Sequence, residues 1–106
     1  MFILNIIQYS IFQGRFINPT IVVGEINASV TLMCNSTSIG QNESFTWKRS
    51  PDNLQLDSLL NDNKTTISDD GQQLTINNLT LSDQLYYGCF NGTTFSNTFR
   101  LIVRSK

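Results

Sequence analysis

The two cysteines of this 106-residue chain, Cys34 and Cys89, have its most reactive side chains. A cysteine pair can be two free thiols, part of a metal site or one disulfide. The chain contains no histidine and no second cysteine pair, so a zinc site would lack ligands and a catalytic thiol would lack a base. The cysteines alone leave free thiols and a disulfide open, and they predict no zinc site.

Other catalytic candidates are weak. General acid–base catalysis most often uses histidine, which this chain lacks. The pairs Asp69-Asp70 and Ser82-Asp83 are typical of turns, where such side chains bond to the local backbone. The acidic residues also lack the ligand spacing of an EF-hand calcium loop. We therefore predict that the protein is not an enzyme and holds no metal and no cofactor.

The charges of the chain exclude a second class of function. The net charge is −1, and the seven cations are scattered along the sequence. Binding to duplex nucleic acid needs a clustered basic surface, so we expect no nucleic-acid partner.

No segment approaches the run of about 20 apolar residues that spans a bilayer. Any membrane attachment would therefore use an anchor outside this chain.

The elements that must position these residues are short strands. A chain of this length forms one domain with a two-layer core. Apolar residues alternate with polar ones in segments of sandwich spacing, separated by turn residues such as Ser50-Pro51-Asp52-Asn53 and Asn91-Gly92. The expected strands are 19–23, 28–34, 45–49, 54–60, 64–68, 72–76, 85–90 and 94–103, and they predict an all-β fold.

The amino-terminal segment is apolar but does not have the cationic start and cleavage site of a secretion signal. We interpret residues 2–16 as a leading strand with some extra extended chain, and the alternative is a disordered tail. Exposed apolar residues favour pairing at a sheet edge over exposure. The expected organisation is an extension at 1–18 and a domain at 19–106.

The order Cys34, Trp47, Asp83, Tyr87 and Cys89 resembles the immunoglobulin superfamily. The resemblance covers about residues 19–104 and implies a two-sheet Greek-key sandwich. The short separation between the cysteines, together with the absence of a Gly-x-Gly bulge in the last strand, is similar to an I-set or a short V-type domain.

The resemblance also implies roles for these residues. Cys34 and Cys89 would form an inter-sheet disulfide packed against Trp47, which closes a loop of about 56 residues and stabilises the fold by roughly 4 kcal/mol. Tyr87 would bond to the backbone in a tyrosine corner, and Asp83 would accept hydrogen bonds there and pair with Lys64. A disulfide implies an oxidising compartment, so we expect an extracellular or cell-surface protein.

Strand parity predicts a binding face. If Tyr87 and Cys89 face the core, their neighbours face out of the sheet that the family names GFC after its strands. Aromatic and arginine side chains are favoured in interface cores. The alternative is an ordinary surface, or a face covered by the amino-terminal segment. The predicted partner-binding residues are Thr46, Lys48, Tyr86, Phe90, Arg100 and Ile102.

Six Asn-x-Ser/Thr sequons exceed the roughly 2.5 that chance would produce in this composition. They are Asn27, Asn35, Asn42, Asn63, Asn78 and Asn91. Parity and loop position place them on the opposite sheet, near its strand ends, or in the loops at one tip. Glycans at these sites would leave the GFC face uncovered.

The resemblance therefore implies an extracellular recognition module for adhesion or receptor binding through the GFC sheet. The expected partner is another immunoglobulin-like domain or a second copy of this chain. Two alternatives stay open: a ligand-binding domain of a signalling or decoy receptor, and a structural spacer in a multidomain array. A short loop at Asn91-Gly92 argues against antigen recognition, and residues 85–90 contain no arginine of the kind that sialic-acid lectins of this family use.

Overall fold

The computed structural model describes residues 16, 18–34, 45–52, 57–90 and 95–105. Within them the chain forms eight strands and one short 3-10 helix. These are β1 (Thr20–Glu25), β2 (Val30–Met33), β3 (Thr46–Ser50), β4 (Asp57–Ser58), β5 (Thr65–Ile67), β6 (Gln73–Ile76), η1 (Leu81–Asp83), β7 (Tyr86–Phe90) and β8 (Phe95–Arg104).

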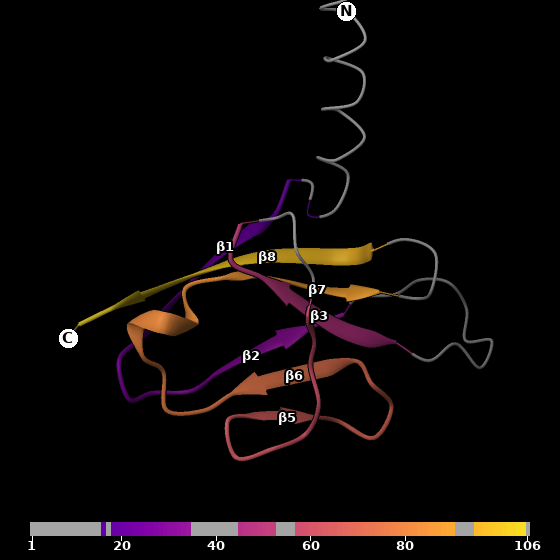
Figure 1. The fold of residues 1–106 in the computed structure, drawn as a ribbon, viewed down its shortest axis with the longest axis horizontal. Helices are drawn as coiled ribbons and strands as arrows, with labels where there is room; N and C mark the ends of the chain where they lie inside the picture. Colours follow the sequence, from indigo (N-terminus) through magenta and orange to yellow (C-terminus); the bar gives the residue numbers. More distant parts are fainter. Residues whose placement is uncertain (1–15, 17, 35–44, 53–56, 91–94, 106) are drawn as a thin grey trace, which may run out of the picture.

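The strands form two sheets, which confirms the predicted all-β sandwich. One sheet has five strands in the order β1-β8-β7-β3-β4, and the other has three in the order β2-β6-β5. In Figure 1 the larger sheet occupies the upper part of the domain and the smaller sheet the lower part. The first strand runs parallel to the last, with Val22 opposite Leu101, whereas all other pairs are antiparallel.

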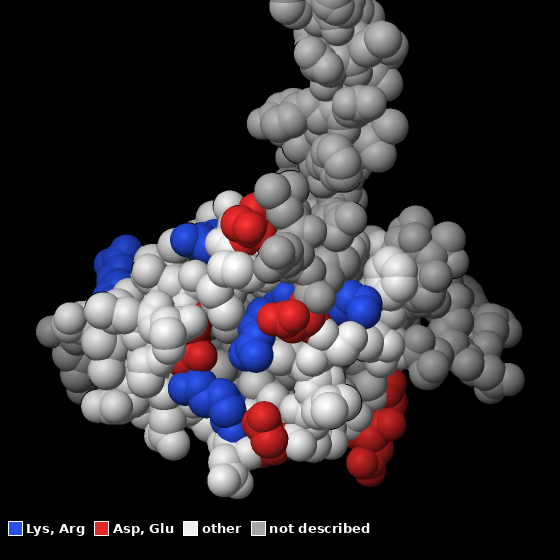
Figure 2. All heavy atoms as spheres, in the orientation of Figure 1, with Lys and Arg blue, Asp and Glu red and all other residues white. Residues whose placement is uncertain are grey.

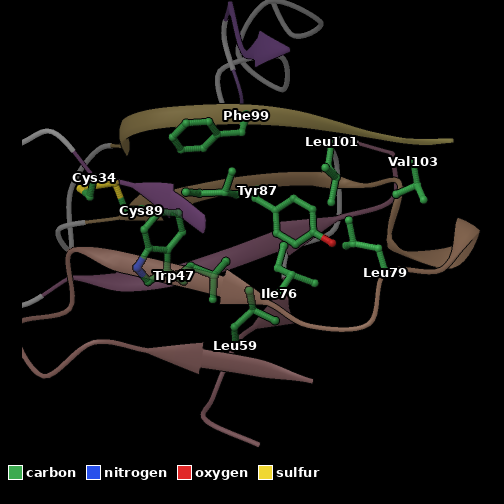
Figure 3. Packing of buried hydrophobic residues seen from close by; sticks show 12 residues of the cluster. Cys34, Trp47, Leu59, Ile76, Leu79, Tyr87, Cys89, Phe99, Leu101 and Val103 are labelled. Atoms are coloured by element: carbon green, nitrogen blue, oxygen red, sulfur yellow. A yellow bond between two sulfur atoms is a disulfide. The ribbon is translucent and has the colours of Figure 1, made fainter. Parts of the chain in front are cut away.

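The core lies between the sheets and is built by alternate residues of their strands. Leu32 and Leu74 face it from the smaller sheet, and Leu101 faces it from β8; all three are at most 2% exposed. Figure 3 shows these layers meeting, with Ile76 and Leu79 pointing toward Tyr87. Inward residues alternate with outward ones along each strand, because each strand can bury only one of its faces.

The disulfide between Cys34 and Cys89 joins the two sheets, with the two Cα atoms 6.0 Å apart. Trp47 lies directly opposite Cys89 on the neighbouring strand and is fully buried (Figure 3). Its indole Nε1 donates a 2.9 Å hydrogen bond to the carbonyl oxygen of Gly71, so the buried polar atom has a partner. The cysteines and the tryptophan therefore occupy the places that the resemblance implied.

The corner before β7 is also as the resemblance implied. The Tyr87 hydroxyl donates a 2.8 Å hydrogen bond to the backbone oxygen of Asp83. The Asp83 carboxylate accepts from the backbone N–H of Thr80 at 2.8 Å and lies 2.7 Å from the ammonium of Lys64. Side-chain contacts thus connect the last turn before β7 to the start of β5.

Some expectations are altered in detail. Residues 54–56 of the strand predicted at 54–60 lie outside the described residues; among the others, Asp57 and Ser58 form β4, which pairs with β3 through Lys48 and Ser58, while Leu59 turns into the core. The predicted leading strand at 2–16 lies outside the described residues except for Phe16, and so does the Asn91-Gly92 turn. The boundary between residues 18 and 19 stays a prediction.

Candidate protein-recognition face

The outward face of the five-stranded sheet is made by the residues that alternate with the buried ones. Directly opposite residues point to the same side of a sheet, and Tyr86 is opposite Arg100, while Gly88 is opposite Lys48. All six residues predicted for the binding face lie on this side: Thr46, Lys48, Tyr86, Phe90, Arg100 and Ile102. Their role in binding stays a prediction.

Four aromatic rings run across this face in a continuous row. The Tyr86 ring lies 5.9 Å from that of Phe16, which lies 4.8 Å from Phe95, and Phe95 lies 5.1 Å from Phe90, between ring centroids. These separations are typical of favourable aromatic contacts. We call Tyr86, Phe16, Phe95 and Phe90 the aromatic row.

Each end of the aromatic row carries a cation. The Arg100 guanidinium lies 4.7 Å from the centroid of the Tyr86 ring, and the Lys48 ammonium lies 5.5 Å from that of Phe90. Both distances fall within the range of cation–π attraction. Arg100 also donates to the backbone oxygen of Gln84, and Lys48 donates to the hydroxyl of Ser58. The sheet thus holds both cations against the rings.

The row is continuous because Gly88 has no side chain. A Cβ atom at this position would lie 2.8 Å from Phe95 Cδ1 and 2.9 Å from Phe16 Cε1, closer than carbon atoms approach. The two rings therefore rest on the bare backbone of β7. Glycine inside a strand often marks such a close approach.

The face continues as an apolar surface onto β1. Ile21 lies opposite Arg100, and Val23 lies opposite Ile102, so both side chains point outward. They are 60% and 49% exposed. Together with the aromatic row they make one side of the domain rich in apolar and aromatic groups, which we call the recognition face.

The outward side of the three-stranded sheet has a different chemistry. Thr75 on β6 lies between Thr31 on β2 and Thr66 on β5, and the Oγ1 atoms of Thr31 and Thr75 are 2.9 Å apart. Gln73 is also exposed there, and Met33 is the apolar residue beside it.

Figure 2 shows basic and acidic groups dispersed among uncharged ones over the surface in view, so charge does not single out any part of that surface.

The structure adds residues to this face. Gly88 is buried because Phe16 and Phe95 lie over it. Phe16, which is 2% exposed, is the one residue of the segment 2–16 that the structure describes, so whether the rest of that segment covers the face stays a prediction. The residues missed were Phe16, Phe95, Ile21 and Val23, and the glycine within β7 was the signal for the first two.

Three of the six sequon asparagines lie in the described residues, and all three are exposed: Asn27, Asn63 and Asn78. They sit near one another at one end of the three-stranded sheet. Asn27 donates its N–H to the oxygen of Leu79, and Lys64, next to Asn63, donates to the oxygen of Asn78. None of the three is on the recognition face. Asn35, Asn42 and Asn91 lie outside the described residues.

The acidic side chains in the turns have local structural partners. Backbone N–H groups of Thr65 and Lys64 donate to Asp62, which lowers the pKa of its carboxyl. The Asp70 carboxyl accepts from the hydroxyl of Ser68 and from the N–H of Gln72, and these bonds lower its pKa as well.

In the part of the chain that the structure describes, no three acidic, histidine or cysteine side chains gather as a metal site would require. No helix there is long and apolar enough to cross a membrane.

The family described as immunoglobulin domain matches residues 15–91, which is most of the chain. This chain belongs to the immunoglobulin superfamily. Immunoglobulin domains are typically not enzymes, and they generally mediate contacts between proteins.

Among solved structures, Drosophila Semaphorin 2a has the same fold as this immunoglobulin domain. The TM-score is 0.69 at 18% sequence identity, and the likeness covers 83% of this chain but 14% of the semaphorin chain. At that identity the likeness concerns the fold alone. No curated protein sequence matches this chain. The membership and the disulfide together indicate an extracellular recognition module.

Proposed function

We propose that this immunoglobulin domain binds a protein partner through the recognition face, in cell adhesion or as part of a receptor. The observation that carries the proposal is the difference between its two outward faces. One presents the aromatic row, two cations and the exposed Ile21 and Val23, while the other presents a threonine ladder. Aromatic and arginine side chains dominate the binding energy of protein interfaces, whereas threonine contributes little.

The charges on the recognition face favour a partner that differs from this chain. Lys48 and Arg100 lie at opposite ends of the aromatic row, and neither forms a salt bridge among the described residues. A second copy docked face to face about a two-fold axis would bring cations against cations, which costs affinity. We propose a partner immunoglobulin-like domain with an apolar centre and carboxylates that meet these two ends.

An exported protein is the setting that fits this function. The disulfide needs an oxidising compartment, and the three described sequon asparagines are exposed away from the recognition face. Glycans on Asn27, Asn63 and Asn78 would cover one end of the three-stranded sheet and would not cover the recognition face. A structural spacer would not need an apolar outward face, so we rank that alternative below recognition.

Binding can be tested with the domain displayed as a multimer on an array of secreted immunoglobulin domains that includes the domain itself. We expect at least one partner, whose binding falls by tenfold or more, or about 1.4 kcal/mol, in Tyr86→Ala and in Val23→Asp. The matched control is Thr66→Ala on the other sheet, which should bind as the wild type does. A partner whose binding falls in Thr66→Ala but not in the first two variants would contradict the proposal.

Self-pairing needs a separate measurement. Light scattering of the purified domain across concentrations should give the mass of a monomer, in keeping with the repulsion between like ends of the row. A dimer that the charge-reversal variant Lys48→Glu strengthens would overturn the heterophilic assignment and favour a homophilic one.

A further inference from the structure

We infer that the recognition face contains a receptor site for one aromatic side chain, and that Phe16 of the same chain occupies this site as a displaceable substitute for a partner's ring. This inference rests on the proposed function and specifies what the partner must present. The site consists of the Gly88 backbone as its floor and the Tyr86 and Phe95 rings as its walls. We call it the Gly88 seat.

The seat is shaped for a flat ring. Phe16 Cε1 approaches to within 2.9 Å of the place where a Cβ of residue 88 would be, so the ring edge occupies the space that every other residue type would fill. The centroid of the Phe16 ring is 4.8 Å from that of Phe95 and 5.9 Å from that of Tyr86, so the ring contacts both walls. A phenylalanine, tyrosine or tryptophan of a partner would make the same contacts, because ring–ring attraction and apolar burial do not depend on which chain supplies the ring.

Phe16 can leave the seat without opening the core. It is 2% exposed, yet it does not belong to the cluster of buried residues around Trp47 and Leu101, because it lies on the outside of the sheet. The residues that support the sandwich therefore keep their contacts when the ring departs. A side chain that is buried outside the core is the kind that local opening releases first.

Phe16 is tethered close in sequence to β1, which begins at Thr20. Asn18 has φ of 50°, in the left-handed region that asparagine tolerates, and Pro19 follows it immediately before the strand. Phe16 stands two positions before Asn18, and its ring lies over Gly88 on the outward side of the sheet. Because Phe16 is tethered so close to β1, its effective concentration at the seat is high, and a partner's ring must compete with it.

The consequence is a site whose affinity depends on its own occupant. A ligand that needs the empty seat binds with an apparent affinity reduced by the fraction of molecules in which the seat is open. Removing the Phe16 ring should therefore strengthen binding of an added aromatic group. Removing any other residue of the aromatic row should weaken it.

A peptide with the sequence of residues 14–20 of this chain serves as the probe, because it carries the natural occupant. It is titrated to millimolar concentration into the Phe16→Ala domain, and the amide signals of Gly88 and Phe95 are followed by NMR. We expect saturable shifts in Phe16→Ala and an affinity about tenfold or more lower in the wild type. The same peptide with alanine in place of its phenylalanine should cause no shifts.

Two further variants keep the test decisive. Gly88→Ala in the Phe16→Ala background fills the floor of the seat and should abolish the response. Phe16→Leu covers the seat with a smaller apolar group and should bind the peptide with an affinity between those of the wild type and Phe16→Ala. Equal binding by the wild type and Phe16→Ala, or no shift at Gly88 in any variant, would overturn the inference.

The outcomes separate this inference from the proposed function. If the peptide binds the emptied seat but no protein on the array binds the domain, the seat exists and the proposed function fails. If a partner binds through Tyr86 and Val23 but Phe16→Ala neither binds the peptide nor gains affinity for that partner, the proposed function stands and the seat does not.

Discussion

The ammonium of Lys64, immediately before β5, lies 2.7 Å from the carboxylate of Asp83, which ends η1. Asp83 is buried, with 6% of its side chain exposed, and the Lys64 side chain is 33% exposed, so the pair is partly shielded from water. The same carboxylate accepts the N–H of Thr80. One side chain therefore both completes the turn before β7 and connects it to the other sheet.

The two roles of Asp83 can be separated by mutation. Asp83→Ala removes the ion pair and the acceptor for Thr80, and we expect it to lower the free energy of unfolding by about 2–3 kcal/mol. Lys64→Met removes the ion pair and the Lys64 hydrogen bond to the Asn78 oxygen but keeps the acceptor for Thr80, and it should cost about 1 kcal/mol or less. Urea denaturation of both variants measures the difference. Equal losses would mean that the hydrogen bond to Thr80 contributes nothing.

Tyr87 should make the free energy of unfolding fall at alkaline pH. Burial raises the pKa of its phenol above the ordinary value of about 10, and the nearby Asp83 carboxylate raises it further. The folded state therefore holds the proton more tightly than the unfolded chain. This stabilisation is complete below pH 10 and is lost as the pH rises above 10, by about 1.4 kcal/mol per pH unit.

The variant that tests this dependence is Tyr87→Phe. At pH 7 it should lower the free energy of unfolding by about 1 kcal/mol, because the bond to the Asp83 oxygen is lost. Between pH 10 and 11 its stability should fall less than that of the wild type, whereas Thr66→Ala should follow the wild type. Parallel curves for the wild type and Tyr87→Phe would show that this phenol does not govern alkaline unfolding.

Gly24 on β1 lies between the sheets without room for a side chain. A Cβ atom there would lie 2.5 Å from Leu79 Cδ1 and 2.8 Å from Val30 Cγ1. We expect Gly24→Ala to lower the free energy of unfolding by about 1–3 kcal/mol through overpacking. Val30→Ala should cost less in the Gly24→Ala background than in the wild type, since it removes one of the clashing atoms. Strictly additive losses would contradict the clash.

The disulfide is expected to supply a large share of the stability. It closes a loop of about 56 residues, so Cys34→Ala/Cys89→Ala should lower the free energy of unfolding by roughly 4 kcal/mol. Both cysteines are at most 2% exposed, so a reductant should act on the native protein far more slowly than on protein in denaturant. Counting thiols over time in both conditions measures this, and rapid reduction of the folded domain would be the opposing result.

Glycan occupancy is a prediction that mass spectrometry can test. Secreted from eukaryotic cells, the protein should lose mass on glycosidase treatment, and Asn27→Gln, Asn63→Gln and Asn78→Gln should each remove one glycan. None of these changes should alter binding through the recognition face, because the three asparagines lie at the end of the other sheet. An unglycosylated secreted product would remove the shielding part of the proposal.

The sequence by itself determined the sandwich, its disulfide and its corner. Period-two alternation predicted the short strands and the all-β fold, because a strand in a two-layer fold buries one face. The cysteines, the tryptophan and Tyr87 indicated how the layers are joined, because their spacing is tied to one architecture. These features are read from residues that are close in the chain or part of a known pattern.

Only the tertiary structure decided what covers the outward face. The parallel pairing of β1 with β8 adds Ile21 and Val23 to that face, and Phe16 lies over Gly88. No local pattern records either contact, since strand pairing and ring packing join segments from opposite ends of the chain. Alternation predicts which side of a strand points outward, but it does not predict which distant side chain will lie against it.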